Sequence, residues 1–373
     1  MEATIGGTRR HLRDVALAQR AEGVDVAVAA SALRMPEVRR DFAVLRDAGV
    51  DVHEVPMVRE IRPAADTRHL LELRRLLKRL RPDVVHTHSS KGGALGRVAS
   101  LSTGIGRRVH TPHTFAFLFS AMFSGPKRRI FRGVETYLGR RTDRIVAVGE
   151  SEAATIRASG VVPAERVVVV PNGIDASPWR GARALDRAQL GVPVGVPLAA
   201  VVGLLNVAKG QDVLLRAMAL EPARRLHLLV VGHGEDEAAL RALADELGIA
   251  ARVHFLGWRA DVPGILAAVD FVVLPSRWEG LPYIVLEAMA AEKPVVATDV
   301  DGARELVLEG KTGFVARRED PADLARALAL ALALDPQQRA TMGAAGAALQ
   351  AARYDQRTMA RALVTLYEGV LGA

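Results

Sequence analysis

Short apolar runs alternate with longer amphipathic segments along almost the whole chain. The runs are rich in Val, Ile and Leu and end on Gly, Pro, Ser or Asn, which is typical of buried strands. The longer segments repeat apolar positions every three or four residues, as amphipathic helices do. Strands are predicted at 24–30, 50–55, 83–88, 109–113, 145–149, 167–170, 198–203, 226–232, 253–257, 271–274 and just before 299, and helices at 8–22, 42–48, 69–80, from 151, 211–220, 236–247, from 282, 327–334, 337–352 and 356–371. This alternation predicts an α/β fold with parallel sheets.

Residues 327–334 alternate Ala and Leu, a period of two that by itself fits a strand. Both residue types are strong helix formers, and Asp320 with Pro321 supplies a cap and a first turn. We therefore predict a helix there.

Composition limits the class of protein. The chain has 373 residues, half of them hydrophobic, which is enough for two α/β domains with separate cores. It has no Cys, which excludes disulfides, Cys-ligated zinc and thiol nucleophiles. Without a signal-peptide pattern at Met1 or an apolar run of about 18 residues, the expected location is the cytoplasm or a membrane surface.

The stretch 271–304 carries two notable carboxylates. An apolar strand ends at Pro275, and an almost wholly apolar helix begins near Pro282 with Glu287 as its one charge. A buried carboxylate costs several kcal/mol unless it is paired. Glu279 precedes the helix, in the loop at the carboxyl end of the strand, where open α/β sheets bind ligands. Both residues are candidate hydroxyl acceptors; a buried salt bridge for Glu287 and a solvated loop position for Glu279 are the alternatives.

The sequence of this stretch resembles a known family. Pro-Ser-x-x-Glu-Gly-Leu-Pro at 275–282, the seven residues between the two Glu, and Lys-Pro-Val-Val-Ala-Thr at 293–298 are similar to the signature of the retaining glycosyltransferase family 4. The resemblance implies the GT-B fold, two Rossmann-like domains with parallel sheets facing across a cleft. The domains expected are an acceptor-side domain at 1–176, a nucleotide-sugar domain at 177–355 and a final helix, 356–373, that crosses back.

The resemblance also implies an activity. The expected reaction transfers a sugar, with retention, from a nucleoside diphosphate donor, with UDP favoured, to a glycan or polyprenyl-linked acceptor in cell-surface polysaccharide synthesis. Another GT-B activity, such as a nucleotide-sugar epimerase or an inverting transferase, and a donor-binding protein without turnover are the alternatives. The donor is a substrate, and no cofactor is expected.

Site roles follow from the same resemblance. It implies that Glu279 contacts the donor sugar's hydroxyls and Glu287 the ribose. It places a His, here His113, before a loop that closes on the sugar. The remaining donor-contact residues that it implies are Gly6 and Gly7 at the diphosphate, Trp258 near the base, and Gly280 and Leu281 beside Glu279.

Lys209 is a candidate on physical grounds. It stands at a predicted helix N-terminus, where backbone N–H groups and the helix dipole favour an anion such as a diphosphate. The family usually has an Arg where this sequence has Leu204. Lys209 alone, Asn206 or an Arg from elsewhere would then have to stabilise the leaving diphosphate.

Other polar motifs are assigned no metal. His86 and His88 share one face of a predicted strand, a spacing that could serve a metal, but no third ligand is evident nearby. We prefer a role in lining the cleft on the acceptor side. Asp299 and Asp301 are interpreted as loop and N-cap residues, and Gly310 begins a turn.

The N-terminus is unusual for such a domain. Gly6 and Gly7 arrive almost at once, so the hydrophobic strand expected before them is missing. A parallel sheet without that strand leaves backbone groups unpaired. The hypothesis is that Met1 is not the natural start.

The first half of the chain is basic. Residues 1–176 hold 29 Lys and Arg against 19 Asp and Glu, a balance of +10. Without RNA-type motifs, this favours phosphate-bearing or membrane-surface partners over nucleic acid. Clustered aromatic and basic residues suit a membrane interface, with a core-facing segment as the alternative: Phe115, Phe117, Phe119, Phe123, Phe131, Lys127, Arg128, Arg129 and Arg132.

Overall fold

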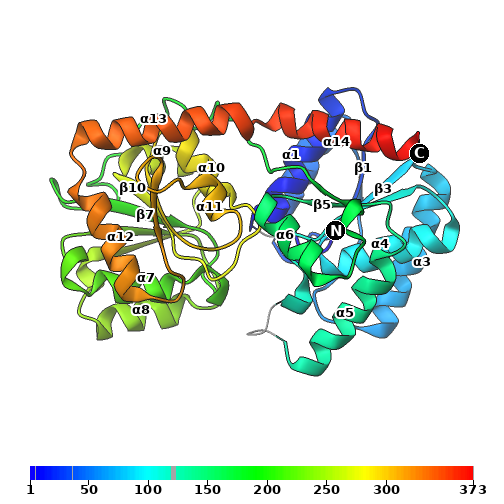
Figure 1. Ribbon diagram of the computed structural model, residues 1–373, viewed down its shortest axis with the longest axis horizontal. Coiled ribbons are helices and arrows are strands. Elements are labelled where there is room, and N and C mark those ends of the chain that lie inside the picture. The colour runs from blue at the N-terminus through cyan, green and yellow to red at the C-terminus, as the bar shows by residue number, and fades with distance from the viewer. Residues whose placement is uncertain (5, 36, 119–122, 373) are drawn as a thin grey trace. The chain divides into compact units, whose positions relative to one another are not determined.

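The computed structural model describes residues 1–4, 6–35, 37–118 and 123–372. The chain divides into two compact units, one formed by Met1–Asn172 with Gln356–Ala373 and the other by Gly173–Asp355. Both units are built on parallel strands joined by helices (Figure 1), which confirms the predicted α/β class.

The second unit contains one six-stranded parallel sheet with the strand order β12-β11-β10-β7-β8-β9. Its strands are β7 (Leu198–Val202), β8 (His227–Val231), β9 (Val253–Gly257), β10 (Phe271–Leu274), β11 (Val295–Thr298) and β12 (Gly313–Ala316). Its helices are α7 (Gln211–Met218), α8 (Glu237–Glu246), α9 (Val262–Ala268), α10 (Tyr283–Ala290), α11 (Ala303–Leu306), α12 (Pro321–Ala333) and α13 (Pro336–Arg353).

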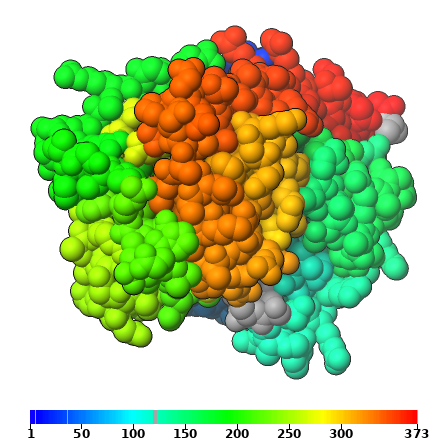
Figure 2. Space-filling view, turned by 60° about the vertical axis from the view of Figure 1, so that its left-hand side comes forward, coloured from blue at the N-terminus to red at the C-terminus, as the bar shows by residue number. Residues whose placement is uncertain are grey.

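Helices cover both faces of this sheet, with α7, α8 and α12 on one face and α9, α10 and α13 on the other (Figure 1). Figure 2 shows the chain from α12 into α13, in orange, at the surface of the unit. Strands β10 and β11 are buried at every position, because each side chain meets a helix layer. Their sequences are therefore continuously apolar.

The first unit holds its strands in two groups. A four-stranded parallel sheet has the order β3-β4-β5-β6, and β1 pairs with β2. The strands are β1 (Ala27–Ala30), β2 (Asp51–Glu54), β3 (Val84–His88), β4 (Arg107–Thr111), β5 (Arg144–Ala147) and β6 (Val167–Val169). The helices are α1 (Gly6–Ala21), α2 (Val38–Asp47), α3 (Pro63–Leu80), α4 (Ser90–Thr103), α5 (Gly125–Gly139), α6 (Glu150–Ser159) and α14 (Gln356–Leu371).

Helix α14 runs beside α1, although the two are more than 300 residues apart (Figure 1). The Gln19 amide donates to the Tyr367 hydroxyl at 2.9 Å, and the Gln356 amide donates to the Asp14 carbonyl at 3.0 Å. The last helix of the chain is thus part of the first unit.

The predicted elements are present, with boundaries shifted by a few residues. Helix α3 begins at Pro63, ahead of the predicted residue 69, because proline suits the first turn of a helix. Residues 327–333 lie in α12, and the Asp320 side chain caps it by accepting from the Asp323 amide, as predicted. The N-cap prediction for Asp301 is wrong, because Gly302, with a φ of 74°, caps α11.

The N-terminal residues lie against β1. The Met1 amine donates to the Ala29 carbonyl at 2.6 Å, and the Ser31 amide donates to the Met1 carbonyl at 3.0 Å. Gly6 and Gly7 are the first residues of α1, two positions earlier than the predicted helix start. The hypothesis about the natural start stays a prediction.

The Phe-rich segment belongs mainly to the core. Phe115 and Phe117 are buried in a hydrophobic cluster with Ile145 and Ile156, so the membrane-facing interpretation is wrong for these two rings. Phe131 packs against the same cluster and Phe123 packs on Phe131, while Phe119 lies outside the described residues. Over the part of the chain that the structure describes, no helix is both long and apolar enough to cross a membrane.

Candidate functional site

The strand order of the second unit reverses between β10 and β7. From β7 the sheet continues to β8 and β9, whereas from β10 it continues to β11 and β12 in the other direction. The loops after two such strands leave toward opposite faces of the sheet, and the crevice between them is the usual ligand site of open α/β sheets. Lys209 follows β7 and Glu279 follows β10, so both predicted residues lie at this point.

Lys209 and Glu279 form an ion pair. Lys209 Nζ donates to Glu279 Oε1 at 2.6 Å, and the Ser276 hydroxyl donates to the same oxygen at 2.6 Å. Because both donors meet Oε1, they fix the rotation of the carboxylate. The ammonium has three N–H groups, which allows Lys209 to bind a phosphoryl oxygen as well as Glu279.

The backbone before α7 is held tightly against the exit of β10. Gly210 has a φ of 61°, and a Cβ on it would stand 2.1 Å from the Pro275 carbonyl oxygen, so glycine is required. The side-chain amide of Gln211 donates to the Leu204 backbone carbonyl at 2.9 Å. These contacts position Lys209, the last residue of the short helix η3 (Val207–Lys209), at the start of α7.

Glu287 lies in α10, the helix that follows the Glu279 loop. Its residue surface is 8% exposed, as the apolar sequence around it predicted. Glu279 and Glu287 are thus presented by a single strand-loop-helix unit on β10. The ribose role predicted for Glu287 stays a prediction.

The other donor contacts predicted in the second unit occupy loops of the same sheet edge, whereas Gly6 and Gly7 begin α1 of the first unit. Asn206 is the N-cap of η3, and Trp258 follows β9 with 44% of its surface exposed. Leu281 is buried, and Gly280 packs closely on Gly302. An exposed indole at this edge is available to stack on a flat ring.

A second cation beside Lys209 is Arg277, which sequence reasoning missed. Its guanidinium donates to both oxygens of Asp212 at 2.9 and 2.8 Å and to Glu319 at 3.2 Å. Its backbone amide also donates to the Ala208 carbonyl. Two carboxylates neutralise Arg277, so it holds the loop before α7 in place. It does not replace the Arg that the family usually has at position 204.

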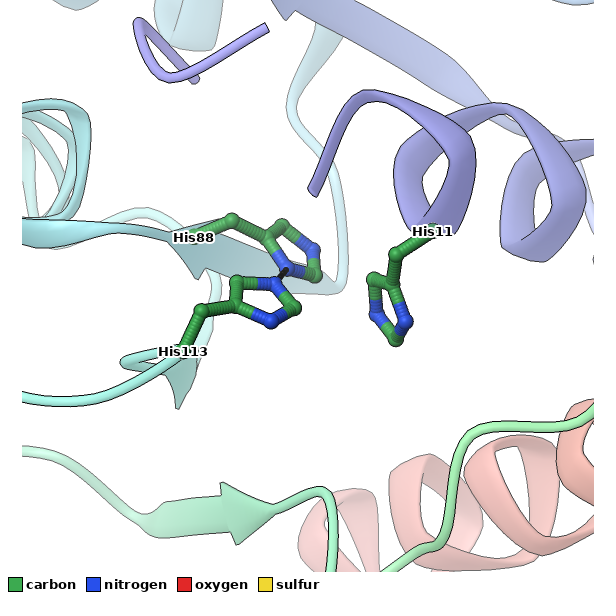
Figure 3. A group of neighbouring side chains, drawn as sticks. All are labelled: His11, His88 and His113. Atoms are coloured by element: carbon green, nitrogen blue, oxygen red, sulfur yellow. Dashed lines mark hydrogen bonds between the residues drawn. The ribbon is translucent and has the colours of Figure 1, made fainter. Parts of the chain in front are cut away.

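The first unit carries a cluster of three histidines. His11 comes from α1, His88 ends β3 and His113 follows β4, and their rings point toward one another (Figure 3). One nitrogen from each ring lies within 4.8 Å of the others. The sequence-based view that no third ligand lies near His88 is therefore wrong. His86 is engaged elsewhere, with the Tyr367 and Thr111 hydroxyls.

Backbone strain is concentrated beside these histidines. Ser89, His113 and Thr114 have φ values of 63°, 51° and 73°, which non-glycine residues rarely adopt. The Glu152 carboxylate accepts from the Thr114 and Val148 amides, and the Glu2 carboxylate accepts from the Ser89 hydroxyl and the Gly92 amide. Strained residues of this kind persist where the surroundings hold them, often at functional sites.

Burial keeps these imidazoles neutral. It lowers the pKa of His11 to about 4, and together with the neighbouring rings it holds the pKa of His88 and His113 well below the usual value. Sequence reasoning assigned no role to His11, Glu152, Ser276 or Arg277. Ser276 and Arg277 lie within the Pro-Ser-x-x-Glu motif, which was the one available signal, and no motif marks His11 or Glu152.

Comparisons with known proteins agree with this geometry. The family model described as "Glycosyltransferase Family 4" matches residues 5–178, and the one described as "Glycosyl transferases group 1" matches residues 182–348. UDP-Gal:alpha-D-GlcNAc-diphosphoundecaprenol alpha-1,3-galactosyltransferase of Escherichia coli is 30% identical, over 74% of this chain and 73% of that protein. D-inositol 3-phosphate glycosyltransferase of Nocardia farcinica is 34% identical, over 78% of this chain and 67% of that protein.

The fold has a solved counterpart. HepE of Anabaena, whose crystal structure contains UDP and glucose, superposes with a TM-score of 0.82 and 24% identity, covering 98% of this chain and 96% of HepE. The two Rossmann-like units are therefore those of the GT-B fold. The fold, the two family models and the curated relatives agree, and the chain belongs to the family 4 glycosyltransferases.

Proposed function

We propose that this glycosyltransferase transfers a sugar from a UDP-linked donor, with retention of configuration, to a lipid-linked acceptor in the synthesis of a cell-surface glycan. The observation that carries the proposal is the Lys209–Glu279 pair at the reversal of strand order in the second unit. The coarser statement, a family 4 transferase that acts on nucleotide sugars in glycan synthesis, follows from the family.

The pair suits the chemistry of the donor. Transfer breaks the bond between the sugar and the diphosphate, so negative charge develops on the departing phosphate oxygen. Lys209 and the backbone N–H groups at the start of α7 stabilise that charge. Glu279, fixed through Oε1, offers Oε2 to a sugar hydroxyl, and holding the sugar in place lowers the barrier further.

Two relatives support a UDP-linked donor. The Escherichia coli relative carries UDP-Gal in its name, and HepE was solved with UDP and glucose. The exposed Trp258 after β9 and the buried Glu287 in α10 are the residues that we assign to the base and the ribose.

The two relatives differ in the acceptor substrate for which they are named. The Escherichia coli relative is named for a diphosphoundecaprenol substrate, whereas the Nocardia relative is named for an inositol phosphate. The surface of α5 favours the lipid-linked class, because it exposes 63% of Ile130 and 57% of Tyr137 among arginines. A shallow cavity of about 600 Å³ on this surface is lined by Arg129, Arg132, Gly133, Thr136, Tyr137, Arg140 and Arg141.

Exposed apolar side chains beside arginines suit an anionic lipid surface, since each basic residue near it is worth about 1 kcal/mol. Vesicle sedimentation tests this assignment. Binding should require anionic lipid, decrease with salt, and weaken when Arg129 and Arg140 are changed to Glu. Arg224→Glu, an exposed position in the second unit, is the control. Equal binding to neutral vesicles, or none to either kind, would contradict a membrane role.

A donor-binding protein without turnover is the second candidate, and Leu204 favours it, because a weakly charged diphosphate site binds but does not activate. Incubation with UDP-sugars and polyprenyl-linked or soluble acceptors separates the two. Consumption of donor that depends on the acceptor, with an α-linked product from an α-linked donor by NMR, supports the proposal. Donor binding without product supports the second candidate.

A further inference from the structure

We propose that His11, His88 and His113 of the first unit form a binding site for one divalent transition-metal ion of the zinc class. The site goes beyond the glycosyl transfer proposed above and uses residues of the first unit alone. Imidazole is the ligand that Zn²⁺, Ni²⁺ and Cu²⁺ share, and three-His sites are a known arrangement for zinc.

One pair of ring nitrogens has the spacing of a metal site. His88 Nδ1 and His113 Nε2 are hydrogen-bonded at 3.3 Å, and a metal ion that binds both nitrogens displaces the proton between them. In a tetrahedral site with Zn–N bonds of about 2.0–2.1 Å, two ligand nitrogens are separated by about 3.3–3.4 Å. The third ring completes the cluster, since one nitrogen from each histidine lies within 4.8 Å of the others. Figure 3 shows that the three rings converge from separate segments.

His11 is oriented by a neighbour in the manner of a metal ligand. Its Nδ1–H donates to the Asn172 side-chain oxygen at 3.0 Å, because that oxygen can only accept. This bond fixes the tautomer and leaves the lone pair on Nε2. Histidine ligands generally hold their second nitrogen in this way, and loss of such a partner costs 10- to 100-fold in metal affinity.

The three rings lie in a largely buried setting. His11 and His88 are buried and His113 is partly buried. Two carboxylates bond to residues adjacent to the ligands: Glu2 accepts from the Ser89 hydroxyl next to His88, and Glu152 accepts from the Thr114 amide next to His113.

The strained backbone places the ligands. Ser89 and Thr114, each next to a ligand, and His113 itself have positive φ values, and the two carboxylates hold the turns in which they lie. Among the described residues, the cluster contains three protein ligands of the His, Cys, Asp and Glu types. A three-ligand site keeps a fourth position for water or an anionic oxygen.

The experiment is a calorimetric titration of the chelator-treated, full-length protein with Zn²⁺, with the visible spectrum of Co²⁺ as a second readout. We expect one tight site per chain and the absorption of tetrahedral cobalt. His11→Gln and His88→Gln should each weaken binding at least 100-fold, and Asn172→Ala about 10-fold. Circular dichroism and thermal unfolding check that each variant folds.

A matched control lies in the second unit. His227 and His254 face each other with ring nitrogens 3.2 Å apart, but over the described part of the chain no third His, Cys, Asp or Glu joins them in a group of metal-binding type. His254→Gln should leave the tight site unchanged. Absence of tight binding in the parent protein, or binding that survives in folded His11→Gln and His88→Gln but is lost in His254→Gln, overturns the proposal.

Discussion

In each unit a polar cluster lies beside the carboxyl ends of two adjacent parallel strands, but the electrostatic settings of the two clusters differ. In the second unit, Lys209 and Glu279 are an ion pair whose side chains are 28% and 11% exposed. In the first unit, His11, His88 and His113 are neutral rings whose pKa values are lowered by burial. A partly solvated ion pair can exchange partners with a charged substrate, whereas the lone pairs of neutral imidazoles suit a divalent transition-metal ion. The same position in a fold therefore supports different chemistry, set by the side chains.

The largest effect is expected from Glu279→Gln. The amide keeps the size of the side chain but removes its negative charge. The carboxylate that pairs with Lys209 and accepts from the Ser276 hydroxyl is thereby lost. Turnover at saturating donor should decrease about 10²- to 10³-fold, the range for loss of one preorganised polar group. Product formation measured by chromatography gives the result.

The matched control for this variant is Glu221→Gln, which removes an exposed ion pair with Arg224. Its turnover should stay within about twofold of the parent, because exposed pairs contribute little. Near-parental turnover of Glu279→Gln would show that the candidate site of the second unit is wrongly assigned.

Much of this comparison could be predicted from the sequence. The parallel sheets were predictable because apolar runs and amphipathic segments alternate with little ambiguity, and Lys209 and Glu279 each lie in a recognisable local context. Their ion pair could not be predicted, because it depends on β10 lying next to β7. The local hydrophobic pattern does not specify the order of strands in a sheet. The histidine cluster depends in the same way on α1, β3 and β4 meeting in space. The Phe-rich segment was ambiguous, since burial of Phe115 and Phe117 is set by tertiary packing.

A smaller effect is expected from Glu287→Gln, on nucleotide affinity. A hydrogen bond to a charged group is worth about 1.5–3 kcal/mol, so loss of the carboxylate should raise the Kd for UDP by about 10- to 100-fold. Calorimetric titration with UDP measures it. Thermal unfolding of the variant checks that a change in Kd does not come from loss of the fold. An unchanged Kd would remove Glu287 from the ribose site.

The next prediction concerns the effect of Zn²⁺ on the turnover of sugar transfer, which connects the histidine cluster to the donor site. If His113 has its predicted role toward the donor sugar, a Zn²⁺ ion bound to its ring removes it from that role. Saturating Zn²⁺ should then lower turnover about tenfold, and EDTA should restore it. His11→Gln keeps His113 but loses the site, so its turnover should resist Zn²⁺. Equal inhibition of both proteins would place the effect of zinc elsewhere.

The smallest effect is expected from Leu204→Arg, which tests whether the diphosphate site of the second unit is under-charged. Leu204 is partly buried in the loop after β7, and its contact with Gln211 uses the backbone carbonyl, so the substitution preserves that bond. A cation added near a partly solvated phosphate contributes about 1 kcal/mol, which lowers the Kd for UDP about fivefold. Titration at two salt concentrations measures it, because a charge effect decreases as screening rises. Leu204→Met controls for side-chain size. A Kd for Leu204→Arg equal to that of Leu204→Met would mean that Lys209 and the start of α7 already supply all the positive charge the diphosphate uses.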